Sequence, residues 1–490
     1  MKNALCLVLV SCLLVSLPIF ARACTTIIVG RDASADGSRI FGRTEDNHGL
    51  AVKKLEFIPF FSGEADIPFT DVYTGLNLSL PGTGVGYLCI PQAQALNAGR
   101  WEEAAVNAHG VCLSATESIY GSEAALAADP LVEGGIAESA IPTLVMPYIK
   151  TALEGVKRLG ELIGQYGSAE SNAVAFADED AIWYMEIYTG HQWAAVRFPE
   201  DCYTVIGNDG LIGPIDVEDT ENVIVSPDFL SLARDNNFLR MQDGLPDTTL
   251  TYCGPKRNYS QIRVWAGRKM FSPAQTGEYN VNTSYGFAVK ADKKIALEDV
   301  MDLLRWRYEG TPYDVNKNPG IRAIGINRTA ESHIFWMRPA KPSVLWVTLA
   351  NPEMSVFLPL YWNTDPLPDT FTLDVADYDE NSAYFKFRRV SAFAVNDREG
   401  FGAQVRAHWK EMERQLIAAA KVRDAAYLAA GSSARAASAL FADIAGKALH
   451  DADDLFAKGL TAYILSTLSD GGSDAPDMSY DAAMDVDIQK

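Results

Sequence analysis

The sequence predicts an α+β protein built in layers. Residues 24–43 and 105–198 contain several short β-branched or apolar runs, which indicate strands and hairpins. Residues 133–166 carry apolar side chains at helical spacing, interrupted by Pro142 and Pro147. Hairpin-rich regions separated by a long helical stretch are typical of helices packed against antiparallel sheets.

The first 23 residues have the pattern of a secretory signal peptide. Lys2 gives a positive start, residues 4–20 form an apolar run, and Ala21-Arg22-Ala23 is a small-x-small cleavage site. The apolar run is short for a bilayer span, so cleavage is expected rather than an uncleaved anchor. We therefore expect an exported protein, periplasmic or extracellular, with no stable membrane insertion after cleavage.

The first hairpin of the mature chain would begin directly at Cys24. Residues 24–30 read CTTIIVG, a β-branched run typical of a buried strand. Residues 32–38 form a turn cluster, and residues 39–43 return as a second strand. Cys24 is therefore expected at the start of the first strand of a hairpin.

The rest of the chain supplies further strands and then helices. Strands are expected at residues 105–106, 111–115, 173–177, 182–187 and 193–198. From residue 400 the composition changes, and residues 406–430 and 434–468 are predicted to be helices. We thus divide the chain into a signal peptide (1–23), a main domain (24–399), a helical region (400–468) and a disordered tail (469–490).

The charge balance and the cysteine count narrow the function. The chain has 42 basic and 63 acidic residues, and an acidic surface of this kind repels nucleic acid and anionic lipid. Five cysteines remain after signal cleavage, and an odd number suggests one free thiol in an exported protein. The other four either pair, in one of three ways, or stay buried as small apolar residues.

Cleavage after Ala23 would give Cys24 a free α-amino group. That group has an unperturbed pKa of about 7.7–8.0 and can act as a base near neutral pH. A thiol and a base on one residue form a compact nucleophile with its own general base. The alternatives are an ordinary strand cysteine or a lipid attachment site, for which Arg22 fits poorly.

Two charged residues follow at the end of the second strand. Arg43 and Asp46 return towards the start of the first strand, where Cys24 lies. Arg43 is expected to favour the thiolate, and Asp46 to hold the α-amino group by a charge-assisted hydrogen bond. Alone, such a pair is more often a surface ion pair, but its place one hairpin after Cys24 favours a catalytic role.

Other chemistry has little support in the sequence. The six histidines show no zinc-type spacing, so neither a metal nor a cofactor is expected. No Gly-x-Ser-x-Gly elbow is present, which counts against a serine hydrolase. Gly82-Thr83-Gly84-Val85-Gly86 lacks the spacing and the following helix of a phosphate-binding loop.

The block around Cys24 resembles a known family. The segments CTTIIVG at 24–30, DASADGS at 32–38 and RTED at 43–46 look like the N-terminal block of the C69 dipeptidases. Those enzymes are grouped with penicillin V acylases and bile salt hydrolases among the N-terminal-nucleophile hydrolases. Weaker matches are NAHGV at 107–111, SATES at 114–118 and GHQW at 190–193, and the resemblance runs from Cys24 to about Pro359.

The resemblance implies a fold, a reaction and a set of site residues. The fold would be a four-layer αββα sandwich, here with an added C-terminal helical region, and the reaction would pass through a thioester acyl-enzyme. Cys24 matches the nucleophile, Arg43 and Asp46 its supporting pair, and Asn208 the asparagine of the oxyanion hole. Candidate substrate-binding residues are Glu117, which would clamp a peptide amino terminus, and two further polar residues, Asn107 and Arg263. Either Arg263 or the nearby Arg257 would match an arginine that the acylase relatives use late in the domain.

We therefore expect a dipeptidase that acts on short peptides. An acylase of N-acyl amides, with the same machinery in a different pocket, is the enzymatic alternative. An exported, non-catalytic binding lipoprotein is the alternative outside the enzymes, because lipid on Cys24 would block both its thiol and its amine. Homo-oligomer formation stays open, and the C-terminal helices are candidates for a cap, an oligomer contact or a partner site.

Overall fold

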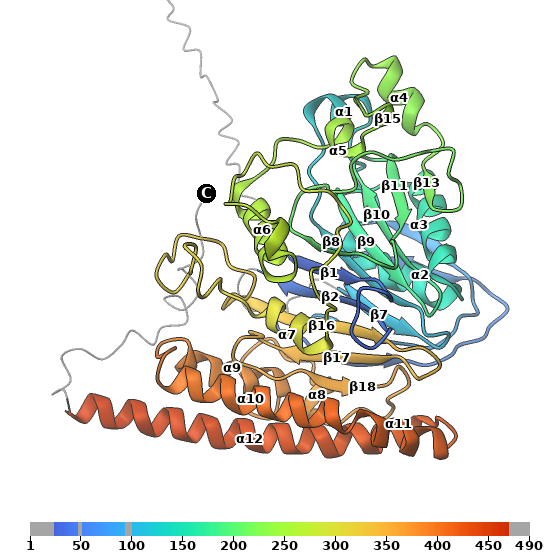
Figure 1. Cartoon of the computed structure of the whole chain (residues 1–490). Helices are drawn as coiled ribbons and strands as arrows, with labels where there is room; N and C mark the ends of the chain where they lie inside the picture. Colours follow the sequence, from blue (N-terminus) through green and yellow to red (C-terminus); the bar gives the residue numbers. More distant parts are fainter. Residues whose placement is uncertain (1–23, 48–50, 94–99, 470–490) are drawn as a thin grey trace, which may run out of the picture.

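Two antiparallel sheets packed face to face form the centre of the protein (Figure 1). The structure is a computed structural model that describes residues 24–47, 51–93 and 100–469. The predicted signal peptide and most of the predicted disordered tail lie outside the described residues. In the described part of the chain, no helix is both long and apolar enough to cross a membrane.

The first sheet has six strands and contains the Cys24 hairpin. Its order is β12-β1-β2-β16-β17-β18, so β1 lies in the interior of the sheet between β12 and β2. The strands are β1 (Thr25–Val29), β2 (Arg39–Asp46), β12 (Tyr203–Ile206), β16 (Thr329–Met337), β17 (Val344–Leu349) and β18 (Leu358–Leu360). The hairpin predicted at residues 24–43 is confirmed, although β2 continues to Asp46.

The second sheet has eight strands and supplies the opposite wall. Its order is β13-β11-β10-β9-β8-β7-β6-β3. The strands are β3 (Glu56–Ile58), β6 (Tyr87–Cys89), β7 (Ala104–Asn107), β8 (Cys112–Glu117), β9 (Asn172–Ala177), β10 (Ile182–Ile187), β11 (Trp193–Arg197) and β13 (Val223–Val225). All five strands predicted between residues 105 and 198 occur in this sheet.

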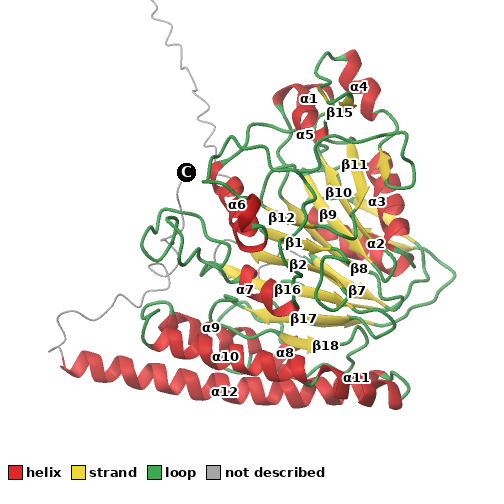
Figure 2. Cartoon of the chain, viewed as in Figure 1, coloured by secondary structure: helices red, strands yellow, loops and turns green. Residues whose placement is uncertain are grey.

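Helices cover the outer faces of both sheets, which gives the expected four-layer αββα sandwich (Figure 2). Side chains of α2 (Ile141–Val145) and α3 (Ala152–Tyr166) share a core with the eight-stranded sheet. Side chains of α6 (Asn258–Phe271) and α7 (Leu297–Leu304) share another with the six-stranded sheet. Both faces of β1 are therefore buried, which accounts for its continuous β-branched run.

The helical stretch predicted at residues 133–166 is only partly regular. The long helix begins at Ala152, after the N-cap Thr151, whose hydroxyl accepts a hydrogen bond from the Glu154 N–H at 3.1 Å. It ends before Gly167, which has a φ of +73°. The preceding segment, which holds Pro142 and Pro147, forms only α2 and short 3₁₀ turns.

The C-terminal helices lie along the β18 edge of the six-stranded sheet (Figure 1). They are α9 (Ala383–Ala394), α10 (Phe401–Ala418), α11 (Ala420–Ala429) and α12 (Ala434–Ser469). The helix predicted at 406–430 is thus two helices, and the helical group already begins with α9, before residue 400. Its apolar faces join the cores of the sandwich.

The remaining elements are short and lie in connections. Two small hairpins are β4 (Ile67–Thr70) with β5 (Asn77–Leu80), and β14 (Met241–Gln242) with β15 (Leu245–Pro246). The short helices are α1 (Glu123–Ala128), α4 (Phe229–Asp235), α5 (Thr248–Tyr252) and α8 (Asp369–Thr372).

Candidate active site

Cys24 lies at the point where three strand ends meet. It directly precedes β1, and its side chain is buried, with 3% of its surface exposed. Thr25 lies opposite Thr44 of β2, and Thr26 lies opposite Ile206 of β12. Because both pairs are antiparallel, the end of β2 and the residues after β12 come to the two sides of Cys24.

Arg43 contacts the Cys24 thiol directly. Its Nη1 lies 3.1 Å from Sγ, while its Nε donates to Ser114 Oγ at 2.7 Å and its Nη2 contacts Glu103 Oε2 at 2.7 Å. Ser114 and Glu103 belong to the β7–β8 region of the second sheet. The guanidinium therefore reaches from β2 across the sandwich, and all three of its nitrogens are used.

Asp46 lies on the other face of β2, towards the helices. Its carboxylate accepts a hydrogen bond from Thr329 Oγ1 at 2.5 Å and contacts the Arg322 guanidinium. It is 1% exposed, and its negative charge is among those that raise the pKa of the Cys24 thiol. Asp46 is thus close to Cys24, as the sequence predicted, and two residues that the sequence did not indicate hold it in place.

Arg263 of α6 contacts both the start of β1 and Asn208, which follows β12. Arg263 Nη1 donates to the Cys24 carbonyl and, at 2.9 Å, to Thr25 Oγ1, while its Nη2 donates to Asn208 Oδ1. Burial, together with the positive charge of Arg322, lowers the pKa of the Arg263 guanidinium to about 10. Arg263 therefore contacts the backbone of Cys24 as well as Asn208, the residue predicted for the oxyanion hole.

The turn after β12 fixes Asn208 at its backbone. Its N–H donates to Ser260 Oγ at 2.9 Å, and its carbonyl accepts a hydrogen bond from Arg257. Arg257 Nε also contacts Asp209 Oδ1 at 2.8 Å. Arg263 therefore contacts the Cys24 carbonyl, whereas Arg257 holds the turn that carries Asn208.

The charge balance around the thiol is unfavourable for a thiolate in the intact chain. Burial, together with the charges of Glu103, Asp46 and Glu138, raises the pKa of the Cys24 thiol to about 12. Arg43 lowers it, and is the largest opposing influence. A thiolate at Cys24 therefore needs a further positive charge or contact with water.

The two remaining predicted residues differ in their placement. Glu117 ends β8, three residues after Ser114, and its backbone N–H donates to the Glu138 carboxylate. Because the charge of Glu138 also acts on the Cys24 thiol, Glu117 borders the same region.

Asn107, by contrast, uses its side chain within the scaffold. Its Nδ2 donates to the carbonyls of Met146 and Ile149 at 3.0 and 2.9 Å, and its Oδ1 accepts from the N–H groups of His109 and Val111 at 3.0 and 3.1 Å. It ties the β7–β8 turn to the helical layer. These hydrogen bonds favour a structural role over the substrate-binding role expected from the sequence.

The other cysteines form no bridges in the structure. The five cysteines of the described chain, Cys24, Cys89, Cys112, Cys202 and Cys253, all carry free thiols. Three of the four besides Cys24 are buried. Of the two expectations for these four cysteines, the structure thus agrees with small apolar residues rather than disulfides.

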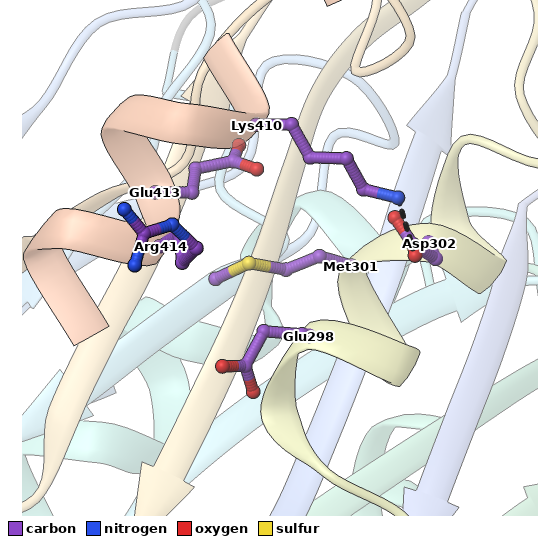
Figure 3. A pocket seen from close by; sticks show the side chains of 6 residues that line it. All are labelled: Glu298, Met301, Asp302, Lys410, Glu413 and Arg414. Atoms are coloured by element: carbon purple, nitrogen blue, oxygen red, sulfur yellow. Dashed lines mark hydrogen bonds and ion pairs between the residues drawn. The ribbon is translucent and has the colours of Figure 1, made fainter. Parts of the chain in front are cut away.

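A surface pocket elsewhere offers no comparable chemistry. It lies between α7 and α10 and is lined by Glu298, Met301, Asp302, Lys410, Glu413 and Arg414 (Figure 3). Lys410 Nζ contacts Asp302 Oδ2 at 2.7 Å, and Glu413 holds Arg305 through two contacts at 2.8 and 2.9 Å. Lys410, Asp302, Glu413 and Arg414 are thus engaged in ion pairs, and no residue of the Cys24 site lines the pocket.

Comparison with known proteins identifies the family of the chain. A family model described as "Peptidase family C69" matches residues 23–411. The chain belongs to peptidase family C69. The C69 match covers both sheets and every residue of the Cys24 site named above.

Two proteins named as probable dipeptidases are similar to this chain over most of its length. A "Probable dipeptidase" of Latilactobacillus sakei is 34% identical and covers 71% of this chain and 76% of its own. A "Probable dipeptidase B" of Streptococcus pyogenes serotype M1 is 31% identical, covering 82% and 84%.

Among solved structures, penicillin V acylase from Agrobacterium tumefaciens has 12% identity, a TM-score of 0.32, and coverage of 69% of this chain and 86% of its own. A mutant conjugated bile acid hydrolase from Clostridium perfringens has 11% identity, a TM-score of 0.29, and coverage of 70% and 93%.

The site also contains residues that sequence reasoning missed. Glu103 and Ser114 contact Arg43, and Arg322 and Thr329 contact Asp46. Ser114 lies inside one of the family-like blocks, and Glu103 directly precedes a strand, so both carried a weak signal. Arg322 lies outside the described helices and strands and had none.

Proposed function

We propose that this protein is a cysteine-type dipeptidase whose nucleophile is the N-terminal Cys24 of the processed chain. The observation that carries the proposal is the contact of 3.1 Å between Arg43 Nη1 and Cys24 Sγ at the start of an interior strand. Asp46 and Asn208 flank the same strand end. A thiol, a cation, a carboxylate and an amide are thus collected where processing would create a free amine.

The reaction begins with attack of the Cys24 thiolate on the scissile carbonyl. The α-amino group takes the thiol proton and then gives it to the leaving amine, so the amide bond breaks as the thioester forms. Asn208 donates to the oxyanion of the tetrahedral intermediate. Water, activated by the same α-amino group, then hydrolyses the thioester and releases the second product.

Processing and activation are one step in this scheme. In the intact chain the nitrogen of Cys24 belongs to a peptide bond and has no basicity, and the thiol is buried with a raised pKa. Cleavage after Ala23 frees an α-amino group beside the thiol and the Asp46 carboxylate, and this amine becomes an ammonium group when it takes the thiol proton. The new positive charge favours the thiolate, and Asp46 fixes the amine. The family match, which begins at residue 23, supports this start point.

The substrate class follows from the relatives. Proteins named as dipeptidases are more than 30% identical to this chain over most of its length. We assign the substrate ammonium group to Glu117, and its position at the end of β8, where its N–H donates to Glu138, supports this role. We therefore propose short peptides with a free amino terminus as substrates, and an exported enzyme that meets them outside the cytoplasm.

The test compares the exported protein with its Cys24→Ser variant on dipeptides and on N-acyl amides. Intact mass and N-terminal sequencing establish whether Cys24 is first and unmodified. Cys202→Ser is the matched control, since Cys202 is a buried cysteine with a hydrogen-bonding neighbour, Asp201 Oδ1 at 3.3 Å. We expect dipeptide turnover that only Cys24→Ser abolishes. Preference for N-acyl amides would instead assign an acylase, and lipid on Cys24 would contradict catalysis.

A further inference from the structure

The arginine that contacts the thiol is shared between three partners. Arg43 Nη1 reaches Cys24 Sγ, Nε reaches Ser114 Oγ, and Nη2 reaches Glu103 Oε2. The side chain of Arg43 is 1% exposed and that of Glu103 is 2% exposed. Water therefore does not screen this ion pair, and the direction of each guanidinium nitrogen depends on its protein partners.

Glu103 is itself held at both carboxylate oxygens. Oε2 receives Arg43 Nη2, and Oε1 accepts a hydrogen bond from Trp101 Nε1 at 2.7 Å. Trp101 is buried and packs edge-on against Tyr73, with ring centroids 4.7 Å apart. Glu103 thus lies between Trp101, in the segment that leads into β7 of the second sheet, and Arg43 of the first sheet, and it links the two sheets next to Cys24.

We propose that Glu103 is a positioning residue, which orients Arg43 so that Nη1 faces the Cys24 thiol. It acts through Arg43 and does not touch the reacting atoms. The proposal rests on the proposed role of Cys24, but it concerns the state of the thiol and can be tested without substrate.

The chemistry of the carboxylate makes the proposal specific. Both contacts of Glu103 are with donors, so two acceptor oxygens are needed. Glutamine has one acceptor oxygen and one NH₂ group. The NH₂ group would have to face a donor, either that of Arg43 or that of Trp101, and could not accept a hydrogen bond from it. Glu103→Gln therefore removes a charge and also disturbs one of the two contacts, while the side-chain volume stays the same.

Two roles for Glu103 predict opposite shifts of the Cys24 thiol. The negative charge of Glu103 raises the thiol pKa, so its loss alone would lower that pKa. Arg43 lowers the thiol pKa more strongly than Glu103 raises it. If Glu103 orients Arg43, its loss therefore raises the thiol pKa, because the larger influence is weakened.

The experiment measures the rate at which iodoacetamide alkylates Cys24 as a function of pH, by mass spectrometry of the N-terminal peptide of the processed protein. We expect Glu103→Gln to raise the apparent thiol pKa, and a rise of one unit slows alkylation below that pKa about tenfold. We also expect kcat for a dipeptide to fall more than KM changes. A lowered or unchanged thiol pKa would overturn the proposal.

Three further variants keep the result interpretable. Glu102→Gln is the matched control, because Glu102 is the adjacent buried carboxylate and contacts Tyr87, Thr143 and Arg100 rather than Arg43. It should leave the thiol pKa unchanged. Glu103→Asp keeps both acceptor oxygens and should raise the thiol pKa less than Glu103→Gln does. The aspartate variant also provides the test if the glutamine variant does not fold.

In an Arg43→Leu background, Glu103→Gln should no longer raise the thiol pKa, because Glu103 acts through Arg43. Removal of both partners of a buried ion pair is often tolerated, so the double variant is expected to fold. A rise of the same size in that background would contradict the positioning role. The wild type could fail to turn over dipeptides while the variants still show the expected shifts of the thiol pKa. That result would contradict the proposed substrate but not the role of Glu103.

Discussion

At the scale of single residues, Asn208 is held so that its amide has a defined orientation. Its Oδ1 accepts from Arg263 Nη2, and its backbone is fixed by Ser260 and Arg257. An amide whose oxygen faces an arginine directs its NH₂ group the other way, as an oxyanion donor requires. This arrangement explains why a residue in an ordinary turn sequence can serve the reaction.

Asn208→Asp tests this role with little risk to the fold. The carboxylate keeps the contact with Arg263 but replaces the NH₂ donor by an acceptor. We expect kcat to fall about 10²–10³-fold, the loss found when one oxyanion donor is removed, while the thermal midpoint stays close to that of the wild type. Steady-state kinetics on a dipeptide check this prediction. A kcat within a factor of three of the wild type would exclude Asn208 from the oxyanion hole.

The sequence revealed the residues of the site that lie on one hairpin. Cys24, Arg43 and Asp46 are local neighbours, because the register of β1 and β2 brings them together. Glu103 and Arg322 come to the site from distant parts of the chain. Their positions depend on how the two sheets and the long connections pack, and a pattern in one sequence does not encode that packing locally.

At the scale of elements, α3 shows how glycine sets the distance between a helix and a sheet. Gly155 faces the eight-stranded sheet, and a Cβ there would lie 2.4 Å from the ring of Phe176. A Cβ at Gly164, on the same helix, would meet nothing within 4 Å. Substitution at Gly155 therefore tests the packing of the helix on the sheet, whereas substitution at Gly164 tests helix propensity alone.

Alanine at these two positions should have opposite effects on stability. We expect Gly155→Ala to lower the free energy of unfolding by about 1–3 kcal/mol through overpacking. Gly164→Ala should raise it by about 0.5–1 kcal/mol, because alanine favours the helix and restricts the unfolded chain. Urea unfolding of both variants checks the prediction, and effects of the same sign would contradict the packing of α3 on the sheet.

The elements that the sequence predicted well are those with a continuous β-branched or apolar run. The Cys24 hairpin and the five strands between residues 105 and 198 all occur. Strands β16, β17 and β18 were not predicted, although β16 pairs directly with β2. Strand β16 begins with small and polar residues, and β18 has only three residues with Pro359 in the middle, so neither forms a clear β-branched run. The break between α10 and α11 falls in an alanine-rich run without proline or glycine, which gave no signal.

At the scale of the whole molecule, a buried charge cluster links stability to pH. Glu45 and Glu331 lie directly opposite each other on β2 and β16, and both are buried. Burial raises the pKa of each carboxyl to about 8, with Lys53 and Arg43 acting in the opposite direction. Lys53 Nζ contacts Glu45 at 2.5 Å, and His333 Nδ1 contacts Glu331 at 2.9 Å.

The sign of the pH dependence follows from these raised pKa values. The unfolded chain loses these protons near pH 4.5, whereas the folded chain keeps them until about pH 8. Their contribution to stability is therefore complete below pH 4.5 and is lost as the pH rises to 8, by at most about 1.4 kcal/mol per pH unit for each proton.

Glu331→Gln should weaken this dependence. We expect its stability relative to the wild type to increase from pH 5 to pH 8, because the variant has one fewer proton to lose and relieves the charge on Glu45. Thermal or urea unfolding at several pH values measures the difference. Parallel stability curves for the two proteins would show that the pair does not titrate in this range.

The central claim is that the free amine of Cys24, and not only its thiol, drives catalysis. The most direct measurement compares the chain that begins at Cys24 with a chain that keeps one extra residue, Ala23, before it. Both contain the same thiol and the same contact with Arg43, but in the second the nitrogen of Cys24 is an amide. We predict dipeptide turnover by the first and a loss of at least about 10²-fold in kcat for the second, the lower range for a missing general base. Equal turnover by both chains would contradict the account.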